Sequence, residues 1–249
     1  MTDRLAAPAE LTSLAQELFG PNLPLAERYA RLLQTTGAEQ GLIGPREVDR
    51  IWERHLINCA LMQEELGPVG TVGTLADVGS GAGLPGLVLA LARPDIEVTL
   101  IETMQRRVTW LEETLEDLAA FADTWVDASA AHADAAAPVQ FPSVTVIRSR
   151  AEELHGQLRF DVVTARAVAA LDKLAKWTLP LARVGGRLVL LKGQSAPEEI
   201  KKAAPVLKRL GGRDARISVI HRDGIEVPTR VVTVDVTERP AKKGSRGGK

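Results

Sequence analysis

Apolar residues recur at helical spacing along the first 70 residues. Between Leu11 and Leu18 they follow the i, i+3, i+4, i+7 pattern of one apolar helix face. A second helix is expected over residues 25–33. A third is expected over 46–66, where Gly67 and Pro68 end it. The beginning of the chain is therefore predicted to be helical.

From residue 74 onward, short β runs alternate with helical stretches. The β runs are expected at 74–78, 97–101, 143–147, 161–165, 187–191, 215–221 and 230–237. Helical stretches are expected between them at 84–92, 106–118, 151–154, 171–181 and 197–210. Strands separated by helices indicate parallel βαβ units, so the pattern predicts a doubly wound α/β sheet, with the last two runs as an antiparallel end.

Three parts of the chain follow from this pattern. Residues 1–70 form an N-terminal helical extension, and 71–239 form the α/β domain. Within that domain, 119–142 contains ten alanines and three aspartates but no lysine or arginine, and is interpreted as a surface insertion, partly helical. Residues 240–249 are rich in glycine and lysine and are expected to be a disordered basic tail.

Composition narrows the class of protein. The 249 residues are 45% hydrophobic and 25% charged, which is ordinary for a globular chain. The apolar runs are far shorter than the roughly 18 residues of a membrane span, and the first residues lack a secretory pattern, so a cytoplasmic location is expected. Cys59 is the single cysteine, which excludes an intramolecular disulfide framework and a cysteine-cluster zinc site.

Charge is distributed unevenly along the chain. The net charge is −1, but residues 192–249 carry 14 Lys and Arg against 7 Asp and Glu, whereas 1–191 carry 17 against 25. Such asymmetry suggests contact with nucleic acid through part of the molecule. A merely solvated basic tail explains it equally well.

The strongest chemical signal is the segment Asp77–Gly86, DVGSGAGLPG, between a predicted strand and a predicted helix. Its glycines permit positive φ and let backbone N–H groups approach a ligand. The part from Gly81 onward satisfies G-x-G-x-x-G, and Glu102 ends the next strand about 20 residues on, where an acidic side chain binds ribose hydroxyls. Both NAD-dependent dehydrogenases and S-adenosylmethionine enzymes use this arrangement, so spacing alone leaves the ligand open.

The same segment carries a resemblance to a known family. DVGSGAGLPG, with FDVVTARAV at 160–168 and GGRLVLLKG at 185–193, closely resembles the RsmG family of bacterial small-subunit ribosomal RNA guanine-N7 methyltransferases, also called glucose-inhibited division protein B. The likeness covers about residues 45–195. It departs from the family at Asn58–Cys59, where Asp-Ser is expected, and in the longer insertion.

The resemblance implies a class I methyltransferase fold, Rossmann-like with an antiparallel last strand, and S-adenosylmethionine as the cofactor. It also implies cofactor-binding roles for Gly79, Leu84, the pair Ala151–Glu152 and Arg166, beside Glu102. The implied substrate is a guanine in the 530 loop of 16S ribosomal RNA, free or in the small subunit. A monomer that binds neither DNA nor a membrane is expected.

The predicted chemistry needs little from the protein's side chains. Guanine N7 has a lone pair and no proton, so no general base is required and no catalytic residue is predicted. No metal-binding motif is found among the four histidines. His55 shares an apolar stripe with Trp52 and Cys59 and is interpreted as a buried, hydrogen-bonded histidine; the alternative is that it and Arg54 touch RNA.

Basic residues near the C-terminus are candidate contacts for the RNA backbone. They are Lys192, Lys201, Lys202, Lys208, Arg209, Lys242, Lys243, Arg246 and Lys249. Arg106 and Arg107 are candidates too, although solvated surface arginines fit the pattern as well. A nicotinamide-dependent oxidoreductase is disfavoured because the only tyrosine, Tyr29, lies in the helical extension; a non-catalytic RNA-binding module is the third hypothesis.

Overall fold

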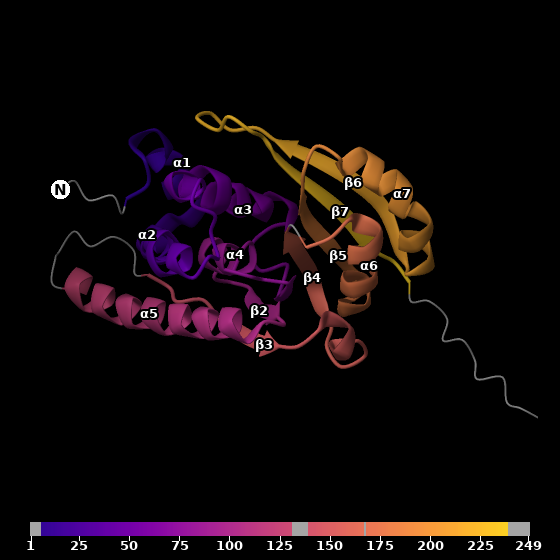
Figure 1. Cartoon of the computed structure of the whole chain (residues 1–249), viewed down its shortest axis with the longest axis horizontal. Coiled ribbons are helices and arrows are strands. Elements are labelled where there is room, and N and C mark those ends of the chain that lie inside the picture. Colours follow the sequence, from indigo (N-terminus) through magenta and orange to yellow (C-terminus); the bar gives the residue numbers. More distant parts are fainter. Residues whose placement is uncertain (1–5, 131–138, 167, 239–249) are drawn as a thin grey trace, which may run out of the picture.

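The computed structural model describes residues 6–130, 139–166 and 168–238, and within them seven strands form one sheet (Figure 1). The strands are β1 Thr74–Val78, β2 Glu97–Glu102, β3 Val144–Arg148, β4 Phe160–Arg166, β5 Ala182–Lys192, β6 Gly212–Ile220 and β7 Thr229–Val236. Their order is β3-β2-β1-β4-β5-β7-β6. The first five are parallel, whereas β7 runs antiparallel to both β5 and β6. The predicted doubly wound sheet with an antiparallel end is confirmed.

The order of the strands reverses between β1 and β4. β1 pairs with β2 on one side and with β4 on the other. From Leu75 to Val78 every residue of β1 is buried, as expected for a central parallel strand covered on both faces. In open α/β sheets ligands bind outside the carboxyl ends of the strands at such a switch point. The carboxyl end of β1 is therefore where a site is expected.

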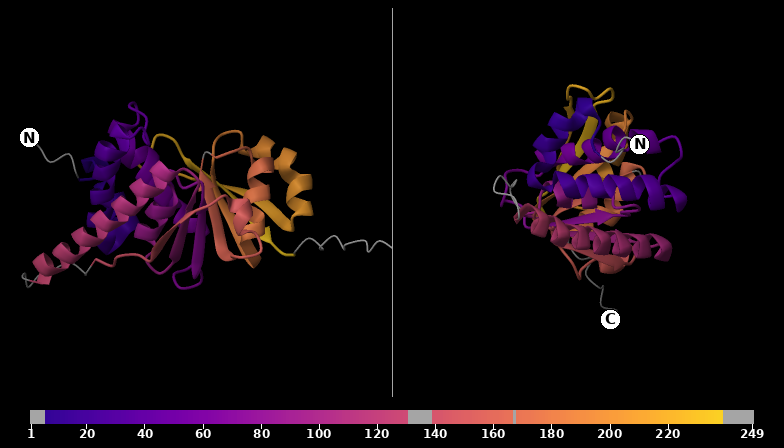
Figure 2. Two further views of the ribbon diagram at one scale, coloured as in Figure 1. Left: turned by 60° about the horizontal axis from the view of Figure 1, so that its bottom comes forward. Right: turned by 90° about the vertical axis from the view of Figure 1, so that its left-hand side faces the viewer.

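Helices cover both faces of the sheet. They are α1 Thr12–Phe19, α2 Leu23–Leu32, α3 Asn58–Ala60, α4 Gly86–Ala92, α5 Gln105–Ala130, α6 Leu171–Thr178 and α7 Ala196–Arg209. The left view of Figure 2 shows the N-terminal helices and α5 on one side of the sheet and α6 and α7 on the other. Among the described residues, no helix combines the length and the apolar character needed to cross a membrane.

The N-terminal helices share a hydrophobic core with the sheet. Leu25 and Tyr29 of α2 and Leu61 are fully buried, and they belong to one cluster with Leu75 of β1 and Leu87 of α4. The N-terminal helices and the sheet are therefore joined by one continuous hydrophobic core. The division of the chain near residue 70 stays a prediction about domains.

The predicted third helix is a chain of short helical turns. They are Val48–Arg50, Trp52–Ile57, Asn58–Ala60 (α3) and Leu61–Glu65. The stripe predicted for this segment is buried at Trp52, His55, Cys59 and Met62. The side of residues 48–65 that carries His55 therefore faces the interior of the protein.

Helix α5 is longer than the sequence pattern predicted. It runs from Gln105 to Ala130, so the prediction that this helix ends at residue 118 is wrong. Leu118 and Ala122 are buried, and alanine has the highest intrinsic helix propensity, which carries the helix into the predicted insertion 119–142. Residues 131–138 of that insertion and the predicted tail 240–249 lie outside the described residues.

Candidate active site

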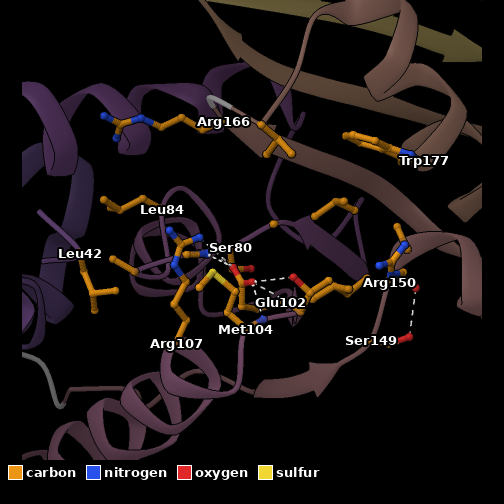
Figure 3. A pocket seen from close by; sticks show the side chains of 18 of the residues that line it. Leu42, Ser80, Leu84, Glu102, Met104, Arg107, Ser149, Arg150, Arg166 and Trp177 are labelled. Carbon is orange, nitrogen blue, oxygen red and sulfur yellow. Dashed lines mark hydrogen bonds and ion pairs between the residues drawn. The ribbon is translucent and has the colours of Figure 1, made fainter. Parts of the chain in front are cut away.

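A cavity of about 620 Å³ lies at the carboxyl ends of β1, β2, β3 and β4 (Figure 3). All six residues predicted to bind a cofactor line it: Gly79, Leu84, Glu102, Ala151, Glu152 and Arg166. They come from four different strand ends, and the fold brings them together. Their binding roles stay predictions.

The glycine-rich turn forms an open wall of this cavity. Gly79 and Gly81 have φ values of 75° and 60°, in the left-handed region that favours glycine. A Cβ on Gly81 would meet no atom closer than 3.9 Å, so the space above this residue is free. The Gly79 N–H donates to the Ile101 carbonyl oxygen at 2.8 Å. The turn is thus held to β2 while its exposed backbone can approach a ligand closely.

A buried carboxylate anchors the far end of the turn. Asp77 is fully buried, and its Oδ2 accepts a hydrogen bond from the Gly86 N–H at 2.9 Å. Burial raises the pKa of Asp77 to about 7, against the opposing effect of the Gly86 hydrogen bond. The Tyr29 hydroxyl donates to the Ala82 carbonyl oxygen. Helix α2 therefore supports the turn from the other side.

Glu102 lies inside the cavity rather than on the surface. Its side chain is 3% exposed. Its oxygens accept hydrogen bonds from the N–H groups of Gly81 (3.0 Å), Thr103 (2.7 Å) and Met104 (2.9 Å). Burial alone would raise its pKa, but these bonds and Arg107 outweigh burial and hold the pKa below its usual range. Glu102 is therefore a buried, ionised carboxylate of the cavity wall.

The ionised Glu102 also has room for a ligand hydroxyl. The Thr103 hydroxyl, 3.2 Å from Oε1, belongs to an exposed residue and can give way to a ribose hydroxyl. The carboxylate thus connects the glycine turn to the place where the position of Glu102 after the second strand predicts a ribose.

Two further apolar side chains line the cavity. Met104 lies near Glu102 and Arg107, whereas Trp177 comes from α6 on the side of Arg150 (Figure 3). Glu153 Oε2 accepts from the Arg150 N–H at 3.1 Å and from the Ser149 hydroxyl at 2.8 Å, which fixes the short helical turn 151–154. Apolar side chains in a cavity wall suit a flat, uncharged ring. Met104 and Trp177 were not predicted from the sequence.

Arg166 is held by two side chains of the N-terminal helices. One of its nitrogens lies 2.7 Å from His55 Nδ1, and another donates to Cys59 Sγ at 3.3 Å. His55 Nε2 lies 3.1 Å from a carboxylate oxygen of Glu47. Because the guanidinium can only donate, His55 Nδ1 must be the acceptor, and its proton is on Nε2, facing Glu47.

This network keeps His55 neutral. Burial, with the adjacent Arg166 charge, lowers the pKa of His55 to about 4, although Glu47 opposes the shift. The interpretation of His55 as a buried, hydrogen-bonded histidine is confirmed, and a neutral imidazole positions Arg166 toward the cavity. Leu42, Ile43 and Glu47, from the loop before this segment, also line the cavity and were not predicted.

The low pKa of His55 makes its contribution to stability depend on pH. Below pH 6.5 the unfolded chain binds a proton at His55 that the folded chain does not bind until about pH 4, so the contribution of His55 to stability falls over this interval. The full effect is about 3 kcal/mol, and about 2 kcal/mol is reached at pH 5. Urea unfolding at pH 7 and pH 5 should show the stability advantage of the wild type over His55→Gln shrinking by about that amount. For the exposed control His221→Gln, the difference in stability from the wild type should be the same at both pH values. If this difference changes with pH equally for the two variants, the result would contradict this account.

Comparison with known proteins decides the family. The family model described as rRNA small subunit methyltransferase G matches residues 22–141 and 133–227. The ribosomal RNA small subunit methyltransferase G of Pseudarthrobacter chlorophenolicus is 47% identical over 235 residues, 94% of this chain and 97% of that protein. The protein of the same name from Salinispora tropica is 48% identical over 255 residues, 97% and 96% of the two chains. The chain belongs to this family.

Solved structures agree with this assignment to the rRNA small subunit methyltransferase G family at the level of the fold. A mutant of MtNAS in complex with S-adenosylmethionine superimposes with a TM-score of 0.52 at 16% identity, covering 93% of this chain and 80% of that one. A predicted O-methyltransferase from Agrobacterium tumefaciens, protein Atu636, gives 0.50 at 21% identity, covering 73% and 82%. The predicted Rossmann-like methyltransferase fold is confirmed. Membership of the family confirms the prediction of a methyltransferase and, with it, of S-adenosylmethionine as the cofactor.

The cavity of this family member fits that cofactor. The open space over Gly81 admits a close ligand, the ionised Glu102 suits a ribose, and apolar lining residues such as Met104 and Trp177 suit an adenine. The cavity volume lies within the range of sites for drug-sized ligands. Among the described residues, no group of three or more His, Cys, Asp or Glu is placed to hold a metal ion.

The structure changes two sequence interpretations in this methyltransferase. The Lys192 side chain is only 10% exposed and contacts Glu199 at 2.9 Å, so the prediction that it meets RNA backbone from the surface is wrong. The ion pair with Glu199, seven residues farther along the chain, holds the ammonium group of Lys192 away from the surface. Arg107 lines the cavity with its NH1 3.5 Å from Glu102, whereas Arg106 is exposed.

Proposed function

We propose that the protein transfers the methyl group of S-adenosylmethionine to N7 of a guanine in the 530 loop of 16S ribosomal RNA. The observation that carries the proposal is the site itself: a ready cofactor cradle beside Arg166, whose neighbouring His55 cannot act as a base because the guanidinium occupies its free lone pair on Nδ1. A reaction at a nitrogen that must first lose its proton needs a base at this place. Guanine N7 does not.

The reaction is balanced without proton transfer. S-adenosylmethionine supplies a methyl group on a cationic sulfonium. The N7 lone pair forms the new carbon–nitrogen bond as the carbon–sulfur bond breaks, so positive charge moves from sulfur to the purine. The protein's contribution is to bring the partners together in line, an effect of up to about 7–11 kcal/mol.

The residues of the chain share this positioning work. The glycine turn offers its backbone to the cofactor, and Glu102 holds both this turn and a ribose. Met104 and Trp177 offer apolar surface to the adenine. Arg166, fixed by His55 and Cys59, presents donors where the base and a phosphate arrive.

Exposed cations outside the cavity suit an RNA partner. Lys201, Lys202, Lys208 and Arg209 are all exposed on α7. They supply attraction to the RNA backbone independent of sequence, and it weakens as salt rises. The proposed partner is 16S RNA or the small subunit, met in the cytoplasm by a monomer.

The test uses methyl-labelled S-adenosylmethionine and small subunits lacking the modification. We expect label in 16S RNA, and borohydride reduction followed by aniline should cleave the strand at one guanine of the 530 loop, since this chemistry reports N7 methylation. Label on another atom or another loop would contradict the proposal.

A further inference from the structure

A second cavity, of about 490 Å³, lies beside the first. The two cavities share Arg166 and Val168 in their linings. The remaining lining residues of the second are Asn58, Ala169, Ala170, Leu191, Lys192, Gly193 and Glu199. They place it at the carboxyl ends of β4 and β5, with the start of α7 as a further wall. A molecule in this second cavity would therefore touch the cofactor cavity across Arg166.

The second cavity contains a donor and an acceptor side by side. Lys192 Nζ donates to Glu199 Oε2 at 2.9 Å and to the Ala169 carbonyl oxygen at 2.8 Å. Glu199 also accepts from the Leu171 N–H and from the Ser195 hydroxyl, each at 2.9 Å. An ammonium has three N–H groups and a carboxylate about four acceptor positions. Within the described chain, these contacts leave one lysine N–H and one carboxylate lone pair for a ligand.

These two groups match the edge of one purine. Guanine presents N7, then the O6 acceptor, then the N1–H and N2–H donors in order around its ring. With N7 at the boundary marked by Arg166, O6 comes next and the N–H donors lie farther in. Adenine carries an amino group in place of O6 and an acceptor at N1, so both groups would face the wrong partner.

We propose that the second cavity receives the target guanine, with Lys192 donating to O6 and Glu199 accepting from one N–H of the opposite edge. The inference rests on the proposed function and adds the residues that select the base. Val168, Ala169 and Leu191 supply apolar surface for the faces of the ring. Unpaired bases splayed out of an RNA loop are read by such hydrogen bonds to their edges.

A purely structural role for the same pair makes a different prediction. Lys192 and Glu199 connect β5 to α7 and, through the Leu171 N–H, to α6. If that is their whole role, changing the base in the RNA and changing Glu199 would reduce methyl transfer independently. If Glu199 reads the base, the two effects would not multiply. The experiment must therefore vary enzyme and base together.

The test measures kcat/KM for methyl transfer to 16S RNA in small subunits, made with guanosine, inosine or 1-methylguanosine at the nucleotide that the wild type methylates. Inosine lacks the N2 amino group and 1-methylguanosine lacks the N1–H. We expect Glu199→Gln to lower kcat/KM about tenfold or more with guanosine. When guanosine is replaced by one of the two altered bases, kcat/KM of Glu199→Gln should fall little further, whereas kcat/KM of the wild type should fall about tenfold. Glu198→Gln, an exposed neighbour on the same helix, should behave like the wild type with every base.

A second variant blocks the cavity without touching the pair. Gly193 lines the cavity, its φ lies outside the left-handed region, and nothing lies within 4 Å of an added Cβ. Gly193→Leu should therefore fold normally and still bind S-adenosylmethionine within twofold of the wild type by calorimetry. Its kcat/KM for the RNA should fall about tenfold or more.

The outcomes separate the two proposals. The inference would be overturned, while the proposed function stands, if Glu199→Gln and each altered base lower kcat/KM by factors that multiply. It would also be overturned if Gly193→Leu keeps the kcat/KM of the wild type. No methyl incorporation by the wild type into unmodified subunits would overturn the proposed function, and this inference with it. Coupling of Glu199 to one altered base, with unchanged cofactor affinity, supports both.

Discussion

Replacing Arg166 by methionine is expected to lower kcat/KM for methyl transfer about 100-fold or more. Arg166 lies on the boundary between the two cavities, and its guanidinium is aligned by His55 and Cys59. Losing a charge-assisted hydrogen bond that holds an RNA phosphate costs about 3 kcal/mol, or about 100-fold in kcat/KM. Methionine keeps much of the length of the side chain but removes its charge and every donor.

The controls for this variant separate charge from geometry. Arg159→Met removes an exposed arginine whose side chain, among the residues that the structure describes, donates to the carbonyl of its neighbour Leu158, and should leave kcat/KM within twofold of the wild type. Arg166→Lys keeps the charge, but a single ammonium cannot reach His55, Cys59 and the cavity at once, so a loss of about tenfold is expected. Cofactor affinity measured by calorimetry shows how much of each loss is binding. Activity of Arg166→Met equal to that of Arg159→Met would refute a role for this residue in the site.

The sequence pattern was sufficient for the sheet because strand and helix periods are local properties. The run Thr74–Val78 was predicted with its observed bounds, and the antiparallel end followed from the two last β runs. The end of α5 was missed for a local reason as well. An alanine-rich segment without lysine or arginine resembles an insertion, yet its helix propensity and the buried Ala122 continue the helix to Ala130.

The site was only partly predictable, because some of it depends on tertiary packing. Glu102 and Arg166 end strands, so the rule for parallel sheets places them at one edge. Leu42 and Glu47 reach the same cavity only because the N-terminal helices pack on the sheet. The one signal in the sequence was an apolar pair, Leu42 and Ile43, between two glycines in an otherwise polar turn.

Lys192 illustrates the same limit in its electrostatics. It stands in the basic C-terminal segment of the chain, and a count of charges assigns it to the surface. The structure pairs it with Glu199, whose pKa is held below the usual range because hydrogen bonds from Lys192, Ser195 and the Leu171 N–H outweigh burial. The partner comes from α7, the next helix along the chain, which packs on α6 and β6. This pairing, which a count of charges cannot reveal, is the basis of the base-reading role proposed above.

The second large effect is expected from Gly86→Ala, which should lower the free energy of unfolding by about 3 kcal/mol or more. An added Cβ would lie 2.5 Å from Leu100 Cδ2 and 2.6 Å from the Asp77 Cβ, both in the packed interior. Overpacking of this kind costs about 1–3 kcal/mol, and disturbing the Gly86 N–H bond to the buried Asp77 costs about as much again. The helix α4 must then move away from β1, and the cofactor turn moves with it.

Two other glycines provide matched comparisons by urea unfolding. Gly81→Ala meets no close atom but has φ of 60°, so a cost of about 1 kcal/mol is expected, together with weaker cofactor binding. Gly44→Ala has neither close contacts nor positive φ and should stay within about 0.5 kcal/mol of the wild type. Three glycines that look alike in the sequence are thus expected to differ for three physical reasons: helix–strand packing at Gly86, backbone conformation at Gly81 and none at Gly44. If Gly86→Ala is no less stable than Gly81→Ala, the close packing of α4 on β1 does not set the geometry of the turn, and the cradle must be held by Glu102 and Tyr29 alone.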